Sequence, residues 1–247
     1  MKNNRNIKIV AASVTGSLHA HRKLACQDYS KHSRGKNFVA VVSDGAGSAK
    51  YGKIGAKIAC ETLCDLLKNA DFSRINTSIY NGIRISREKL MLHRHNSAKS
   101  EANINDFAAT IVGVVYHKNK GVFFHIGDGA AIAIKNDYND FTASRPENGN
   151  FSCETYFYTQ SDWENSLRLT FFDGAKTIFL MTDGLTNFSF SPDFQNIESG
   201  FIVPIDKFLS EAPCKTKALK ALTNTLNAPK AQKINSDDKT LVWIKVR

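Results

Sequence analysis

The sequence contains little proline and no long apolar run. Five prolines are spread over 247 residues, and no Gly/Ser-rich or Pro-rich linker divides the chain. No stretch approaches the roughly 20 apolar residues that a membrane helix needs, so we expect no membrane partner. With 42% hydrophobic and 23% charged residues, the composition is that of a soluble globular protein. We therefore expect one domain over residues 1–247.

Cysteine is also scarce, and its spacing is not that of a zinc site. The five cysteines are Cys26, Cys60, Cys64, Cys153 and Cys214. They are odd in number and lack paired CxxC spacing, so reduced thiols are the simplest interpretation. A basic start followed by an apolar segment resembles a signal peptide. That segment is short and is broken at 15–17, so we interpret it as a first β-strand and expect a cytoplasmic protein.

Positive charge is in excess but is not concentrated. The net charge of +10 comes from 33 basic and 23 acidic residues. No Arg/Lys block is interleaved with aromatics, as a platform for single-stranded nucleic acid would require. An anionic, phosphorylated partner explains the positive charge as well as nucleic acid does. We do not expect nucleic acid as the partner. The best candidate for a basic helical face comprises Arg84, Arg87, Lys89, His93, Arg94, His95 and Lys99.

The hydrophobic pattern predicts many strands with helices between and after them. Strands are predicted at 7–15, 37–43, 107–116, 121–126, 130–135, 154–159, 167–171, 176–182 and 240–246, with a polar loop at 136–150. Helices are predicted at 51–68, 73–95, 205–211 and 215–226. This order indicates two layers of largely antiparallel sheet with helices outside.

Four acidic segments lie far apart in the chain, and at least three of them adjoin a predicted strand. They are Cys26-Gln27-Asp28, Ser43-Asp44-Gly45-Ala46-Gly47, Thr182-Asp183-Gly184 and Asp237-Asp238-Lys239-Thr240. A single Asp-Gly is typical of a turn. The repetition is better explained by carboxylates gathered around a cation, because an unpaired buried carboxylate is costly. With few His or Cys nearby, oxygen ligands favour Mg²⁺ or Mn²⁺.

In this order the motifs resemble those of the metal-dependent protein phosphatases of type 2C, in particular their short bacterial branch. The resemblance covers about residues 7–246. It implies an α+β fold, a four-layer α-β-β-α sandwich with the metal site at one end of two largely antiparallel sheets. Six segments carry it: Gln27-Asp28, Asp44-Gly45-Ala46-Gly47, Ala108-Ala109-Thr110, Gly127-Asp128-Gly129, Thr182-Asp183-Gly184 and Asp237-Asp238-Lys239-Thr240.

The resemblance also implies the ligands of two Mg²⁺ or Mn²⁺ ions. Asp44 would bridge the ions with help from the Gly45 carbonyl, and Asp28 would hold the second ion directly or through water. Asp183 and Asp237 would bind the first. Asp44, Asp183 and Asp237, with a metal-bridged water, would then be the catalytic set.

A third, weaker metal site would involve Asp128. Many members carry a second Asp where this chain has Asn187, and a neutral Asn would weaken that site. The Gly127-Asp128-Gly129 segment is equally well interpreted as a turn between two strands. Other departures are Gln27, where many members have Glu, and Asp238, where Asn is common.

We expect a set of residues that precede Asp28 in the chain to contact the substrate: His19, Arg22 and Lys23. In the family an Arg just before the acidic pair commonly grips the phosphate, and the spacing does not choose between Arg22 and Lys23. His19 lies nine residues before Asp28, and the leaving oxygen needs an acid or a metal-bound water.

The predicted function is hydrolysis of phosphoserine and phosphothreonine in a protein substrate, in bacterial signalling and opposite a cognate Ser/Thr kinase. The alternative is a non-catalytic type 2C-like module that binds a phosphoprotein or regulates a partner. Small phosphate esters also stay open as substrates, because the metal chemistry does not dictate the alcohol.

Overall fold

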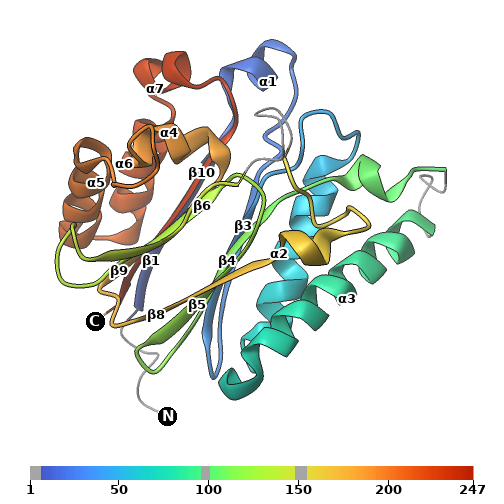
Figure 1. The fold of residues 1–247 in the computed structure, drawn as a ribbon. Coiled ribbons are helices and arrows are strands. Elements are labelled where there is room, and N and C mark those ends of the chain that lie inside the picture. The colour runs from blue at the N-terminus through green and yellow to red at the C-terminus, as the bar shows by residue number, and fades with distance from the viewer. Residues whose placement is uncertain (1–6, 96–100, 148–154, 247) are drawn as a thin grey trace.

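Two five-stranded sheets pack face to face, and helices cover both outer faces (Figure 1). The computed structural model describes residues 7–95, 101–147 and 155–246. Every strand pair in both sheets is antiparallel. The four-layer α+β sandwich predicted from the sequence is confirmed.

The first sheet places the two ends of the described chain side by side. Its strand order is β1-β10-β9-β6-β7, and Ile9 of β1 pairs with Ile244 of β10. The bounds are β1 Ile7–Val14, β10 Lys239–Val246, β9 Thr177–Met181, β6 Ala130–Ile134 and β7 Phe141–Ser144.

The second sheet has the order β2-β3-β4-β5-β8. All six residues of β3 are buried, because one face meets the first sheet and the other meets a helix. This explains why β3 is a continuous apolar run rather than an alternating one. The bounds are β2 Tyr29–Arg34, β3 Phe38–Ser43, β4 Ile111–His117, β5 Lys120–Ile126 and β8 Arg168–Asp173.

The long helices form the outer layers. Helices α2 (Gly52–Leu67) and α3 (Ile75–His95) cover the second sheet, and α5 (Ser199–Glu211) and α6 (Lys215–Leu226) cover the first. Cys60 and Cys64 lie buried on α2. Across the described residues, no helix combines the length and apolar character needed to span a membrane. The short helices are α1 Ser17–His21, α4 Thr186–Ser189 and α7 Pro229–Ile234, and the 3₁₀ turns are Phe72–Arg74, Ile104–Phe107, Trp163–Ser166 and Asp183–Leu185.

Several sequence predictions differ from the structure. The predicted strand 154–159 is wrong: residues 155–159, the part the structure describes, form no named strand. Strand β7 instead lies inside the predicted polar loop 136–150. Strand β2 gave no apolar signal because it is an edge strand whose side chains are largely exposed or only partly buried. Helix α5 begins at Ser199, and it continues through Pro204 because its apolar face packs on the first sheet.

The segment around Asp128 is not a hairpin turn. Strand β5 belongs to the second sheet and β6 to the first, so residues 127–129 cross from one sheet to the other. The alternative of a simple turn between two paired strands is therefore wrong. The crossing brings Asp128 to the end of the sandwich where β3 and β9 also end.

Candidate active site

A cavity of about 440 Å³ lies at this end of the two sheets. It receives carboxylates from Asp44, Asp128, Asp183 and Asp237. Asp44 directly follows β3, Asp183 follows β9, and Asp237 precedes β10. Four segments that are distant in sequence therefore converge on one space. The remaining lining residues are Leu18, His19, Arg22, Ala46, Gly47, Ser48, Thr155, Phe157 and Asp238.

The loop after Asp44 is held by the Ala108-Ala109-Thr110 segment. Thr110 N donates to the Asp44 carbonyl at 2.9 Å, and Thr110 Oγ1 accepts from Asp44 N at 3.0 Å. A Cβ at Gly45 would lie 2.3 Å from the Gly52 carbonyl carbon, so only glycine lets α2 approach this closely. The Thr-bearing motif thus fixes the backbone that carries Asp44 and the Gly45 carbonyl.

Asp28 is buried and is not among the residues that line the cavity. It is 1% exposed, and its Oδ2 accepts a hydrogen bond from Thr182 Oγ1 at 2.8 Å. Its Oδ1 has no hydrogen-bond partner among the residues that the structure describes. Burial raises the pKa of this carboxyl, and the negative charge of Asp238 adds to the rise. An unpartnered buried carboxylate oxygen is costly unless a cation or water completes it.

The carboxylates that line the cavity destabilise one another's charge. Burial and then the charges of Asp183, Asp28 and Asp128 raise the pKa of Asp44 well above its ordinary value. The pKa of Asp183 is raised well above its ordinary value by burial and then by the neighbouring carboxylates, Asp128 first. Such mutual repulsion is relieved when a divalent cation binds between the groups.

Asp128 has one free oxygen as well. Thr155 Oγ1 donates to Asp128 Oδ2 at 2.6 Å, and Oδ1 has no partner within the described ranges. Burial raises the pKa of Asp128. Asn187, on α4, is exposed and does not line the cavity, so it contributes nothing to this wall.

The donor set suits hard divalent cations. It consists of carboxylates, with buried and unpartnered oxygens on Asp28 and Asp128, and such ligands favour Mg²⁺ or Mn²⁺. As they stand, no three His, Cys, Asp or Glu side chains in the described ranges lie close enough together to hold an ion.

Lys239 fixes the turn that presents Asp237. This lysine is fully buried, and its Nζ donates to the carbonyl oxygens of Asn235 at 2.7 Å and Asp237 at 2.8 Å. The Asp237 side chain is left exposed at the cavity. The sequence does not identify this residue, because a lysine that follows two aspartates gives no sign of burial.

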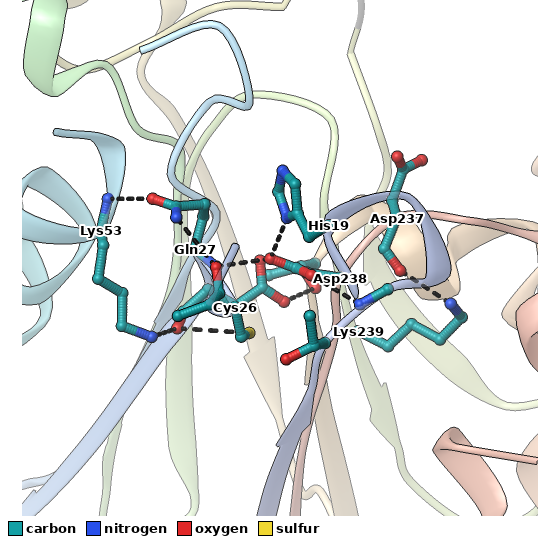
Figure 2. A network of polar contacts seen from close by, with 12 residues as sticks. His19, Cys26, Gln27, Lys53, Asp237, Asp238 and Lys239 are labelled. Carbon is teal, nitrogen blue, oxygen red and sulfur yellow. Dashed lines mark hydrogen bonds and ion pairs between the residues drawn. The ribbon is translucent and has the colours of Figure 1, made fainter. Parts of the chain in front are cut away.

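Asp238 joins the α1 segment to the start of β10. It is 3% exposed and accepts hydrogen bonds from Gly16 N at 2.7 Å, Gln27 N at 2.5 Å and His19 Nδ1 at 2.9 Å. Figure 2 shows the His19 ring above Asp238, with one nitrogen toward the carboxylate and the other pointing away. In the sequence, Asp238 is notable only because Asn is common at this position in the family that the motifs resemble.

Arg22 and Lys23 differ in their position relative to the cavity. Arg22 lines the cavity. Lys23 is not among its lining residues and has a left-handed backbone, with φ of 57°. Of the two residues, Arg22 is therefore the one that lies at the cavity.

The segment between β7 and β8 contributes to the site. Thr155 and Phe157 line the cavity, and neither was predicted as a site residue. Tyr158 and Trp163 of the same segment are buried in the core.

Comparison with known proteins gives concordant matches. A sequence model of the family described as Protein phosphatase 2C matches residues 15–232. Serine/threonine-protein phosphatase 3 of Escherichia coli (strain K12) is 24% identical over 247 residues, which covers 95% of this chain and 96% of that protein.

Solved structures share the fold at low identity. Serine/threonine phosphatase Stp1 from Staphylococcus aureus has a TM-score of 0.69 at 14% identity, covering 100% of this chain and 98% of that one. The catalytic domain of serine threonine protein phosphatase PstP, in complex with 2 manganese ions, has a TM-score of 0.64 at 15% identity, covering 97% of this chain and 98% of that one.

Proposed function

Because this chain belongs to the protein phosphatase 2C family, we propose that it hydrolyses phosphoserine and phosphothreonine in a protein substrate. The family match confirms the resemblance drawn from the six motifs. One observation carries the proposal: Asp44, Asp128, Asp183 and Asp237 come from four distant segments and line one cavity.

The proposed site holds two divalent cations, Mg²⁺ or Mn²⁺. Asp44 would serve both ions with help from the Gly45 carbonyl, Asp183 and Asp237 would hold the first ion, and Asp28 would hold the second. When bound, such ions supply an activated water and neutralise phosphoryl oxygens. The manganese-bound PstP structure supports this choice of metal.

The chain's own residues would position the ester. Arg22 at the cavity wall offers a planar pair of N–H donors that suits two phosphoryl oxygens. Asp128 would serve a weaker third ion. Position 187, where many family members carry a second Asp, is a neutral and exposed asparagine here. We therefore assign two ions to the working site.

The biological setting is part of the proposal. We infer that residues 1–247 act as one catalytic domain, opposite a Ser/Thr kinase, in bacterial signalling. The two named relatives with a stated organism are bacterial proteins. Cys26, Cys60, Cys64 and Cys214 are free thiols, which suits the reducing cytoplasm.

The test is hydrolysis of a phosphothreonine peptide by the purified protein, with Mn²⁺, with Mg²⁺ and with chelator. We expect turnover that needs the metal and is lost in Asp44→Asn. Asp173→Asn is the matched control, because Asp173 is exposed and does not line the cavity. It removes the same charge and should leave the rate unchanged.

Other outcomes would redirect the assignment. Metal binding measured by calorimetry without turnover of any phosphate ester would favour the non-catalytic binding module. Turnover of small esters without turnover of phosphopeptides would move the substrate to a small phosphomonoester. Full activity in Asp44→Asn would contradict the metal site itself.

A further inference from the structure

The cavity contains one imidazole, and its two nitrogens have different surroundings. His19 Nδ1 lies 2.9 Å from Asp238 Oδ2. Because a carboxylate only accepts, this contact fixes the proton on Nδ1. A Cβ added at Gly47 would lie 3.6 Å from His19 Nε2, so this nitrogen faces the loop that follows Asp44. No described residue forms a hydrogen bond to Nε2.

Backbone hydrogen bonds fix the Asp238 carboxylate that contacts this ring. Its carboxylate accepts three N–H groups: two from the backbone of Gly16 and Gln27, and one from His19. An asparagine here would turn an NH₂ group toward at least one of these donors. The aspartate is thus the residue that satisfies all three donors and orients the imidazole.

The proposed reaction requires a proton donor at this cavity. When the ester P–O bond breaks, the serine or threonine oxygen leaves as a strongly basic alkoxide unless it receives a proton. Asp44, Asp183 and Asp237 are committed as carboxylates to the cations. Arg22 does not release a proton. Among the described residues that line the cavity, His19 and Asp128 remain as candidates.

We propose that His19, oriented by Asp238, donates the Nε2 proton to the leaving serine or threonine oxygen. This inference rests on the proposed phosphatase function. A water oxygen forms the new P–O bond, and the ester P–O bond breaks. The departing oxygen takes the Nε2 proton to give the alcohol. The proton released by the water passes to solvent, and His19 regains one from solvent, so water and phosphomonoester yield alcohol and phosphate.

His19 is favoured over Asp128 because its Nε2 is free to point into the cavity. Asp128 already accepts the Thr155 hydroxyl at 2.6 Å on one oxygen, and its other oxygen is buried. Asp238 is a positioning residue in this scheme. Its own carboxylate is occupied by the three N–H donors.

Two substitutions separate the roles of the ring nitrogens. His19→Asn keeps an N–H near the position of Nδ1, able to contact Asp238, and has nothing at the position of Nε2. His19→Gln places its amide near Nε2 and gives up the Asp238 contact. Neither side chain donates a proton as an acid, so both should show the same defect.

The readout is the dependence on the leaving group. We compare a phosphothreonine peptide with p-nitrophenyl phosphate, whose p-nitrophenolate leaves as a stable anion without a proton. Both His19 variants should lose about 100-fold or more in kcat on the peptide and less than about threefold on p-nitrophenyl phosphate. Asp238→Asn should lose about 10-fold in kcat on the peptide. His21→Gln, in the same short helix and exposed, should change neither rate.

The outcomes separate this inference from the proposed function. If the unmutated protein hydrolyses neither compound, the phosphatase assignment fails. If it hydrolyses both and the His19 variants lose both rates equally, with Mn²⁺ binding by calorimetry unchanged, His19 is not the proton donor. A peptide-selective loss in Asp128→Asn without one in the His19 variants would assign the acid to Asp128.

Discussion

The hydroxyl of Thr182 joins two acidic motifs that lie 154 residues apart. Its Oγ1 donates to Asp28 Oδ2 at 2.8 Å and accepts from Thr240 N at 3.0 Å. One side chain therefore ties the segment before β2 to the end of β9 and the start of β10. This contact holds Asp28 in place in the proposed metal site.

Thr182→Val should destabilise the protein and weaken metal binding. Valine keeps the shape of the threonine side chain but leaves Asp28 and the Thr240 N–H without their buried partner. We expect this loss to lower the free energy of unfolding by about 1 to 3 kcal/mol. Thermal unfolding and Mn²⁺ calorimetry measure the two effects. Thr225→Val on α6 is the control, because the Thr225 hydroxyl only bonds a helix carbonyl at the surface. Equal stability of the two variants would contradict the bridging role.

Asp44→Asn should stabilise the metal-free protein while it removes activity. The folded-state pKa of Asp44 lies above its unfolded value, so ionisation costs the folded state more than the unfolded chain. The carboxyl's contribution to stability is present in full below about pH 4 and is lost as pH rises through the folded pKa. At neutral pH the variant should therefore be more stable than the unmutated protein.

The check is thermal unfolding in chelator from pH 4 to pH 7.5. The stability difference between Asp44→Asn and the unmutated protein should grow with pH and then level off. Adding Mn²⁺ should raise the melting temperature of the unmutated protein far more than that of the variant. A difference that does not change with pH would mean that Asp44 carries no excess repulsion.

Arg22→Ala should reduce phosphopeptide hydrolysis by about 10- to 100-fold in kcat/KM, because a charge-assisted contact to phosphate is lost. Lys23→Gly removes the same charge one residue away and should leave the kinetics unchanged. It should also stabilise the protein by up to about 1 kcal/mol, since φ of 57° at Lys23 suits glycine. If Lys23→Gly lowers kcat/KM and Arg22→Ala does not, Lys23 is the phosphate ligand.

Asp206→Ala should destabilise the fold without changing the chemistry. Asp206 is 5% exposed and accepts from Trp243 Nε1, Thr177 Oγ1 and Tyr138 OH at 2.9, 3.1 and 3.0 Å. Removing the shared acceptor should cost about 3 kcal/mol in urea unfolding. Because Asp206 does not line the cavity, kcat per folded molecule should not change. Asp173→Ala supplies the exposed control.

Sequence periodicity was sufficient for the elements that bury one continuous face. Helix α2 and strands β3, β9 and β10 were predicted to within about two residues, because their apolar residues follow the period that burial imposes. Strand β2 and helix α1 carry no such pattern: both are short and largely exposed. Their positions follow from pairing with β3 and from the bonds to Asp238.

The sequence by itself determined the family, the layered fold and the set of carboxylates, because three of the four acidic segments adjoin a strand whose continuous apolar run predicts burial. Only the tertiary structure decided which neighbours share the cavity. It placed Arg22 there and Lys23 outside, buried Lys239, and set His19 on Asp238. The contact of His19 with Asp238 joins residues 219 positions apart, and a local sequence pattern does not encode such a contact.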